Sequence, residues 1–295
     1  MMKIVFMGCV EFSFLALRKV LSLKEAEVVG VITLQRSSMN SDFHSLKSLA
    51  AQHRISCLDA DKKEDLKIAH WIKTLDADII YCFGWSRLLS ERILSACPMG
   101  TVGFHPAALP KNRGRHPIIW ALASGLQETA STFFWMNREA DAGDILDQKR
   151  ILISNTDDAG DLYRKITATA LRQIAGLTSR LASGTAKRIS QDKSKANVWR
   201  KRGREDGRID WRMSDRSIYN LVRALARPYP GAHCVYQGKE VPVWKVSPEF
   251  FPQPNLEPGK ILDVKKRKIF VKCGENAIRL LEHGFKILPK KGEYL

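Results

Sequence analysis

The chain has 295 residues, of which 44% are hydrophobic and 27% are charged. This balance is typical of a globular protein with an ample core and excludes an intrinsically disordered chain. The 48 lysines and arginines outnumber the 31 acidic residues and give a net charge of +17. Such a charge suggests a nucleic acid, a phosphate-bearing small molecule or merely a basic surface.

The start of the chain and its cysteines exclude two further classes. No stretch approaches the roughly 18 uncharged apolar residues that cross a bilayer. The apolar residues 1–10 continue into Glu11 without a small-residue cleavage site, which predicts a buried strand and not a signal peptide. The six cysteines form no CxxC pair and have no histidine at zinc spacing. We therefore expect reduced thiols, no metal site and a cytoplasmic protein.

The first half of the chain alternates short apolar runs with helical patterns. Strands are predicted over residues 3–7, 27–34, 77–83 and 101–105. Helices are predicted over residues 12–23, 46–53, 67–75 and 90–96. This alternation favours an α/β fold with a mainly parallel sheet. Because ligands bind beyond the carboxyl ends of such strands, the loops after Phe83 and Phe104 are the expected site.

The second half begins with a long amphipathic helix predicted over residues 158–182. A basic stretch follows, with eight basic residues and one acidic residue between Lys187 and Arg204. We interpret residues 1–186 as one domain, 187–208 as a basic linker and 209–295 as a second domain. In the second domain, one helix and several short strands predict a small β-barrel. The expected ranges are 215–226 for the helix and 233–236, 241–246, 260–264, 268–272 and 277–281 for the strands.

Two clusters of polar residues carry possible chemistry. His105 comes directly after a predicted buried strand, on a loop with two prolines and three cations, so it either faces a substrate or is a structural loop histidine. The second cluster is the turn from Asn137 to Asp144, with Asp141 and Gly143, which is either functional or an ordinary acidic turn. There is no GxGxxG, P-loop, HExxH or GxSxG motif, which argues against a dinucleotide site and a serine hydrolase.

Several of these motifs together resemble the 10-formyltetrahydrofolate-dependent formyltransferases, almost from end to end. The motifs are Lys3–Phe12, His105-Pro106, Leu109-Pro110-Lys111, Arg113-Gly114, Asp141-Ala142-Gly143, Asp210-Trp211, Arg227-Pro228-Tyr229-Pro230-Gly231 and Pro258-Gly259. The resemblance implies a Rossmann-like formyltransferase domain followed by a small C-terminal β-barrel (OB-like) domain. It also implies formyl transfer from 10-formyltetrahydrofolate to a primary amine.

The resemblance assigns roles to individual residues. His105 and Asp141 would be catalytic, with the histidine relaying a proton or binding the developing oxyanion and the aspartate orienting it. The residues implied to bind the folate are Phe83, Gly84, Trp85, Arg87, Leu88, Arg138, Glu139, Ala140 and Asp144. The residues implied to bind the substrate are Gly103, Lys111, Asn112, Arg113 and Arg115.

One position departs from the family pattern. The family has Asn-x-His, with the asparagine binding the formyl oxygen, whereas this chain has Gly103. The loss of one oxyanion donor typically lowers the rate by about 10²–10³. Either another donor or water replaces the asparagine, or the protein is a weak or inactive homologue.

The acceptor amine divides the family. Methionyl-tRNA formyltransferases carry a basic, glycine-rich insertion after the second strand, but here residues 33–44 are serine-rich and nearly neutral. The chain is more similar to sugar-nucleotide N-formyltransferases, in which Lys111, Arg113 and Arg115 would suit a pyrophosphate. We therefore expect a nucleotide-linked amino sugar, destined for a surface polysaccharide such as the O-antigen of a lipopolysaccharide. A homodimer is compatible with the resemblance. The alternatives are a methionyl-tRNA formyltransferase, with tRNA as partner, and a non-catalytic folate- or nucleotide-binding homologue.

Overall fold

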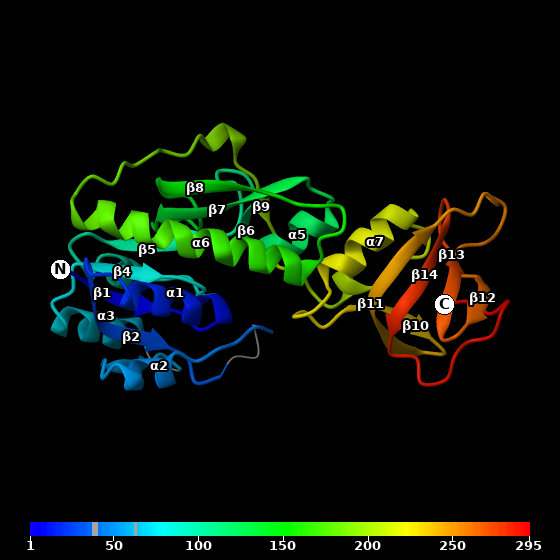
Figure 1. Ribbon diagram of the computed structural model, residues 1–295, viewed down its shortest axis with the longest axis horizontal. Coiled ribbons are helices and arrows are strands. Elements are labelled where there is room, and N and C mark those ends of the chain that lie inside the picture. The colour runs from blue at the N-terminus through cyan, green and yellow to red at the C-terminus, as the bar shows by residue number, and fades with distance from the viewer. Residues whose placement is uncertain (37–40, 62–63) are drawn as a thin grey trace. The chain divides into compact units, whose positions relative to one another are not determined.

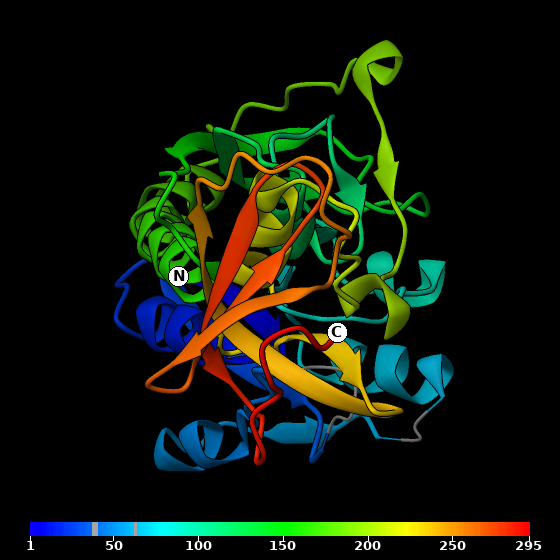
Figure 2. The same ribbon diagram turned by 90° about the vertical axis from the view of Figure 1, so that its right-hand side faces the viewer.

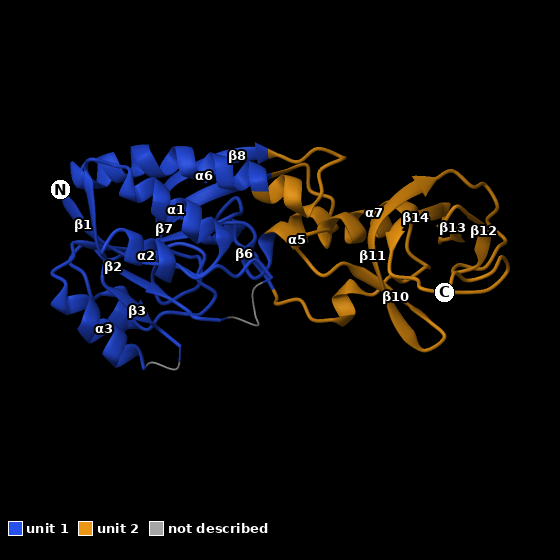
Figure 3. Ribbon diagram, turned by 60° about the horizontal axis from the view of Figure 1, so that its bottom comes forward, with its two compact units in different colours: residues 1–117, 129–151, 164–199 blue, residues 118–128, 152–163, 200–295 orange. Residues whose placement is uncertain are grey.

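The computed structural model describes residues 1–36, 41–61 and 64–295 (Figure 1). Two compact units divide the chain, and each is assembled from separate segments (Figure 3). Unit 1 comprises residues 1–117, 129–151 and 164–199, and unit 2 comprises residues 118–128, 152–163 and 200–295. In the described part of the chain, no helix combines the length and hydrophobicity needed to cross a membrane.

Unit 1 is built on a seven-stranded sheet with the order β3-β2-β1-β4-β5-β7-β8. The strands are β1 (Met2–Met7), β2 (Ala26–Thr33), β3 (Cys57–Asp59), β4 (Ile79–Cys82), β5 (Thr101–His105), β7 (Glu128–Trp135) and β8 (Ile145–Leu152). The pairs from β3 through β5 are parallel, and β7 is antiparallel to β5. The predicted mainly parallel sheet is thereby confirmed, and His105 lies at the carboxyl end of β5.

Helices connect and cover these strands. They are α1 (Glu11–Leu21), α2 (Lys47–Gln52), α3 (Asp65–Thr74), α4 (Glu91–Leu94), α5 (Pro117–Ala123) and α6 (Ala159–Ala182). The long α6 runs across the sheet in Figure 1, and its Thr178 hydroxyl lies 3.0 Å from the hydroxyl of Tyr81 on β4. Burial on both sides explains why β4 reads as a continuous apolar run.

The sequence signals missed the antiparallel part of the sheet. Strand β7 is buried along almost its whole length, so its residues show no alternation between apolar and polar. Two further short strands, β6 (Arg113–Gly114) and β9 (Val198–Trp199), pair in parallel. Strand β9 lies in the stretch that we interpreted as a linker, and no local pattern indicates that it pairs with residues 85 positions earlier.

Unit 2 contains helix α7 (Asp215–Ala224) and a second sheet of five strands, shown in yellow, orange and red in Figure 2. The strands are β10 (Ala232–Tyr236), β11 (Lys239–Glu249), β12 (Ile261–Lys265), β13 (Lys268–Lys272) and β14 (Ala277–His283). Their order is β10-β11-β14-β13-β12, and every neighbouring pair is antiparallel. The Ser214 hydroxyl accepts a hydrogen bond from the backbone of Ser217 and caps α7. The predicted second domain of antiparallel strands is confirmed.

All six cysteines lie in the described part of the chain, and none forms a disulfide. Five of them are buried. Burial raises the pKa of the Cys97 and Cys234 thiols to about 12, because the thiolate would lose its hydration. These thiols are therefore poor nucleophiles at neutral pH.

Candidate active site at the carboxyl end of strand β5

His105 and Asp141 meet at the end of β5. The His105 Nδ1 atom lies 3.6 Å from Asp141 Oδ2, and both side chains are largely shielded, with exposures of 6% and 20%. The other ring nitrogen, Nε2, lies 2.7 Å from the backbone oxygen of Asn112. Because a carbonyl oxygen only accepts hydrogen bonds, Nε2 carries a proton and donates it. In the neutral ring, Nδ1 is then the nitrogen that can take up a proton, and it faces a carboxylate.

Asp141 occupies a left-handed backbone conformation with φ of 57°. Such a conformation is uncommon for a residue other than glycine and is typically maintained by surrounding contacts at functional sites. The Asp141 Oδ2 atom accepts a hydrogen bond of 2.8 Å from the backbone N–H of Gly114. The turn also requires Gly143, because a Cβ there would overlap the backbone oxygen of Trp135.

Side chains of β7 and β8 hold the loop after His105. The Thr132 hydroxyl donates to the backbone oxygen of Ala107 at 2.7 Å. The Gln148 amide donates to the backbone oxygen of Leu109 at 3.0 Å and also to the Thr132 hydroxyl. These bonds attach the loop to β7 and β8, so the position of His105 depends on two strands that the sequence patterns did not reveal.

Gln191 joins the loop and the aspartate turn, although no sequence pattern singled it out. Its amide donates to the backbone oxygens of Asp141 and Gly143 at 2.9 and 2.6 Å. Its Oε1 atom accepts from Arg113 Nε and Nη2 at 3.2 and 2.8 Å. Asn197 contributes a second link, since its side-chain oxygen accepts from the backbone N–H of Asn112 at 2.9 Å.

Arg113 lies inside this network and not on its surface. Its exposure is 3%, and its Nη1 atom donates to Glu139 Oε1 at 3.0 Å. Together with the bonds to Gln191, every nitrogen of the guanidinium has a protein partner. This arrangement favours a positioning role for Arg113 over the expected contact with a substrate phosphate.

The other cations of the loop are placed differently. Lys111 is exposed, whereas Arg115 Nη1 donates to the backbone oxygen of Ser86 at 2.7 Å. Arg115 thereby ties the loop after β5 to the loop after β4. Of the three cations that were expected to bind phosphate, Lys111 is the one on the surface.

The space beside Gly103 is filled by apolar side chains. A Cβ built at Gly103 would lie 2.7 Å from Met136 Cγ and 3.0 Å from Phe134 Cζ. Phe134 belongs to a buried apolar cluster, against which Met136 packs. The packing around Gly103 therefore leaves room for a glycine only, because an asparagine at this position would displace Met136 or Phe134.

The loop after β4 begins with a tightly packed turn. Gly84 has φ of +73°, and a Cβ there would overlap Ser13 and Val10. The Ser13 hydroxyl donates to the backbone oxygen of Phe83 at 2.6 Å. The Phe83 ring is fully buried against Phe6 and other aromatic rings, so it offers no surface to a ligand and instead anchors the start of the loop.

The rest of this loop presents unpaired polar atoms. Among the described residues, the buried Trp85 Nε1 and Ser90 Oγ have no hydrogen-bond partner. Arg87 lies over the Trp85 ring with its guanidinium carbon 5.9 Å from the centroid, and Leu88 is exposed. Unpaired buried donors cost free energy, which a bound polar molecule would offset.

A cavity of about 420 Å³ is lined by residues at α4 and by residues that follow β7. The lining residues are Glu91, Leu94, Ser95, Met136, Asn137, Arg138 and Glu139. Arg138 and Glu91 form an ion pair of 2.5 Å at its edge, while Ala140 is exposed and Asp144 is half-buried in the following turn. The size suits a small ring system.

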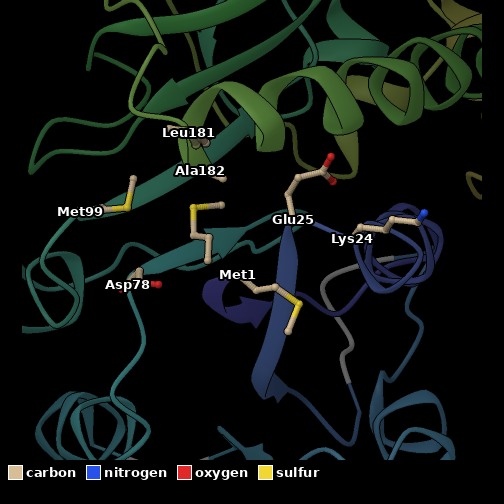
Figure 4. A pocket seen from close by; sticks show the side chains of 8 residues that line it. Met1, Lys24, Glu25, Asp78, Met99, Leu181 and Ala182 are labelled. Atoms are coloured by element: carbon tan, nitrogen blue, oxygen red, sulfur yellow. The ribbon is translucent and has the colours of Figure 1, made fainter.

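A larger cavity, of about 560 Å³, lies at the opposite end of the strands, where they begin (Figure 4). Met2 begins β1, Glu25 directly precedes β2, and Asp78 directly precedes β4, so the lining belongs to the amino ends of the strands. His105 lies at the carboxyl end of its strand, where ligands of parallel sheets bind. The cavity at the amino ends is larger, but its position argues against a catalytic role.

Comparisons with known proteins identify the family of this chain. The family model described as formyl transferase matches residues 2–175, and the model of its C-terminal domain matches residues 202–289. A methionyl-tRNA formyltransferase from Caldanaerobacter subterraneus is 33% identical over 95% of this chain and 91% of its own length. The chain belongs to the formyltransferase family. The formyl donor of this family is 10-formyltetrahydrofolate, so the formyltransferase described here is a one-carbon transferase.

Several solved structures share the fold. An N-formyltransferase from Helicobacter canadensis, in complex with folinic acid and dTDP-3-aminofucose, has a TM-score of 0.71 at 16% identity. That match covers 95% of this chain and 99% of the other. WlaRD, a sugar 3N-formyl transferase, has a TM-score of 0.69 at 15% identity over 95% and 97% of the two chains. HypX from Aquifex aeolicus, in complex with tetrahydrofolic acid, has a TM-score of 0.66 at 18% identity, but only 43% of its chain is covered.

Proposed function

We propose that this formyltransferase transfers the formyl group of 10-formyltetrahydrofolate to the primary amine of a nucleotide-linked amino sugar. The observation that carries the catalytic part is the proximity of His105 Nδ1 to the Asp141 carboxylate at the carboxyl end of β5. The product would serve a surface polysaccharide, such as the O-antigen of a lipopolysaccharide.

His105 is proposed to handle the proton of the reaction. The amine nitrogen forms a bond to the formyl carbon, and the bond from that carbon to the folate nitrogen breaks. The amine loses a proton in this exchange, and the departing folate nitrogen gains one. His105 Nδ1 is the free ring position, because Nε2 is bonded to Asn112. A proton taken up at Nδ1 makes the ring cationic, and the Asp141 carboxylate at 3.6 Å stabilises that cation.

The folate would lie against the loop after β4 and the turn that ends at Asp144. The unpaired donors of Trp85 and Ser90 in this loop and the cavity beside Arg138 support this placement. Leu88 and Ala140 are exposed and are proposed to contact the ligand through their apolar surface.

The distribution of charge supports a small acceptor. The densest basic run, residues 199–204, is largely engaged within unit 2. Arg200 pairs with Asp206, Arg202 donates to the Asp206 backbone oxygen, and Arg204 pairs with Glu240 at 2.6 Å. The Trp120 ring lies beneath Arg200 and Arg202, so it is not an open platform for a base. These arginines do not present a free cationic strip for a phosphate backbone.

Methionyl-tRNA is the second candidate acceptor. It is favoured by the 33% identity to a methionyl-tRNA formyltransferase. The loop that would have to grip a tRNA acceptor includes residues 37–40, which lie outside the described residues, but its sequence from Thr33 to His44 carries only one arginine. We therefore rank the nucleotide sugar first.

A direct comparison of acceptors tests the proposal. The purified protein is incubated with 10-formyltetrahydrofolate and either a panel of UDP- and dTDP-amino sugars or methionyl-tRNA. Mass spectrometry then detects the formylated product. Formylation of a sugar nucleotide and not of methionyl-tRNA supports the proposal, and the reverse result contradicts it. If tetrahydrofolate binds but no acceptor is formylated, the non-catalytic alternative suggested by Gly103 gains support.

A further inference from the structure

We propose that Gln191 is a positioning residue of formyl transfer, which holds the backbone of Asp141 so that its carboxylate faces His105. This inference rests on the proposed catalytic roles of His105 and Asp141. Gln191 lies nine residues beyond the end of α6 at Ala182, in the stretch that we interpreted as a linker. Its contacts make it part of the site.

The amide of Gln191 is fully used on both sides. Its two N–H groups match the two carbonyl oxygens at 2.9 and 2.6 Å, those of Asp141 and Gly143. Its carbonyl oxygen has two lone pairs and accepts the two N–H groups of Arg113. The amide cannot turn over, because its oxygen would then face two carbonyl oxygens and its nitrogen would face a guanidinium. Gln191 therefore has one orientation.

The backbone of Asp141, which Gln191 binds, has a conformation that requires supporting contacts. Asp141 has φ of 57°, a left-handed conformation that persists in a residue other than glycine where surrounding contacts maintain it. Gly114 binds the carboxylate of Asp141, whereas Gln191 binds its backbone oxygen. Two different segments thus fix the two ends of one residue, and both ends are needed to place Oδ2 near His105.

Gln191 also connects this turn to the loop after β5. Arg113 is buried, and its neighbour Glu139 has a side chain that is 63% exposed, so that ion pair is partly screened by water. The bonds from Arg113 to Gln191 therefore add a link between the loop and the turn that is better shielded than this ion pair, beside the bond from Gly114 to Asp141. A loosened link would let the loop and the turn move apart.

Three variants test the proposal. Gln191→Ala removes all four hydrogen bonds. Gln191→Glu keeps an acceptor for Arg113 but places a carboxylate oxygen against two carbonyl oxygens. The matched control is Gln173→Ala on α6, whose buried amide also donates to a backbone oxygen, that of Ser131, but does not touch the Asp141 turn.

The readouts are kcat with the acceptor that the wild type formylates, the melting temperature, and the ¹⁵N signals of the His105 ring. These signals are assigned by their absence from the His105→Gln variant. Both Gln191 variants should lower kcat by about 10- to 100-fold and shift the His105 signals, because small misplacements of catalytic groups are expensive. Gln173→Ala should lower the melting temperature but leave the His105 signals and kcat within about twofold of the wild type.

The proposal is overturned if either Gln191 variant keeps the wild-type kcat, or if its His105 signals match those of Gln173→Ala. The ring signals need no acceptor. If the wild-type protein formylates nothing, the proposed function fails, while unchanged or shifted His105 signals in the Gln191 variants still decide the positioning role.

Discussion

The Asp141 Oδ2 atom lies 2.8 Å from the backbone nitrogen of Gly114 and 3.6 Å from His105 Nδ1. One oxygen therefore faces both the loop after β5 and the histidine at the end of that strand. The hydrogen bond to Gly114 fixes the carboxylate, and the longer distance to His105 leaves room for a proton that arrives at Nδ1 during the reaction. This division of contacts leads to the first prediction.

His105→Ala should lower kcat by about 10²–10⁴, the usual contribution of a positioned acid or base. Asp141→Asn should lower kcat by a smaller factor, because its amide oxygen can still accept from Gly114 but no longer stabilises a cationic ring. Steady-state kinetics with the accepted amine measure both. The control is His53→Ala, since this histidine is exposed at the end of α2. Activity of His105→Ala equal to that of the control would remove His105 from the mechanism.

The second prediction concerns the crowded backbone at Gly143. A Cβ there would overlap the backbone oxygen of Trp135, and this oxygen belongs to rigid main chain. Gly143→Ala should therefore open the turn, lower the free energy of unfolding by about 2–4 kcal/mol and reduce kcat. Urea unfolding and kinetics measure the two effects.

The matched control is Gly184→Ala in the same unit. Gly184 has φ of +69°, but a Cβ there would meet nothing within 4 Å. Its replacement should cost only about 1 kcal/mol, from the backbone conformation alone, and leave kcat unchanged. Equal losses of stability in the two variants would show that crowding at Gly143 does not decide its identity.

Local sequence drew attention to His105, at the end of a predicted strand, and to Asp141, in a glycine-containing turn, but it left a structural reading of each open. Their catalytic roles were implied by the family resemblance, and they stay a prediction. Gln191 could not be found in this way, because it contacts a residue 50 positions earlier and lies in a polar stretch without periodicity. The pairing of β6 with β9 and the bridge between Ile145 and Ile189 hold its segment beside the loop that carries Arg113, and both join residues far apart in the sequence.

In the fold, too, elements with a local sequence pattern were predicted and elements that depend on distant contacts were not. Strand β4 and helix α6 carry strong local patterns, and their predicted ranges overlap the observed ones. Strands β7 and β8 were not predicted, although they hold the loop after His105 through Thr132 and Gln148. The extent of the linker, residues 187–208, stays a prediction.

Gly103 gives a third prediction. Gly103→Asn should lower the melting temperature and kcat, because its Cβ would lie 2.7 Å from Met136 Cγ in a packed cluster. Met136→Ala should relieve this clash. The double variant should therefore be more stable than Gly103→Asn.

The double variant also tests whether an oxyanion donor is missing. If the added amide reaches the formyl oxygen, kcat of the double variant should exceed that of Met136→Ala alone, by up to about 10²–10³. Thermal unfolding and single-turnover kinetics measure stability and the chemical step. A Gly103→Asn variant as stable as the wild type would show that the space beside Gly103 is available without Met136 moving.

The last prediction concerns acid stability in unit 2. Arg200 holds the pKa of Asp206 well below its usual range, mainly through a side-chain hydrogen bond, and the backbone N–H of Gly203 also donates to Asp206. A carboxyl whose pKa is lower in the folded state stabilises the fold above its unfolded pKa, which is about 3.9 for aspartate. This contribution is lost as the pH falls through the folded pKa. Because the Arg200 side chain is 65% exposed, water screens the pair, and we expect its contribution near neutral pH to be small.

Asp206→Asn should accordingly melt at a lower temperature than the wild type at pH 7, and the difference should shrink as the pH is lowered below about 3.9. Melting temperatures across this range measure it. The matched control is Asp263→Asn, which removes an exposed carboxylate of the same unit that pairs with Lys265 and whose pKa is also lowered. Because that pair is screened by water, Asp263→Asn should change the melting temperature less than Asp206→Asn at pH 7. A difference between Asp206→Asn and the wild type that stays constant or grows toward low pH would mean that the ionised pair with Arg200 does not stabilise this unit.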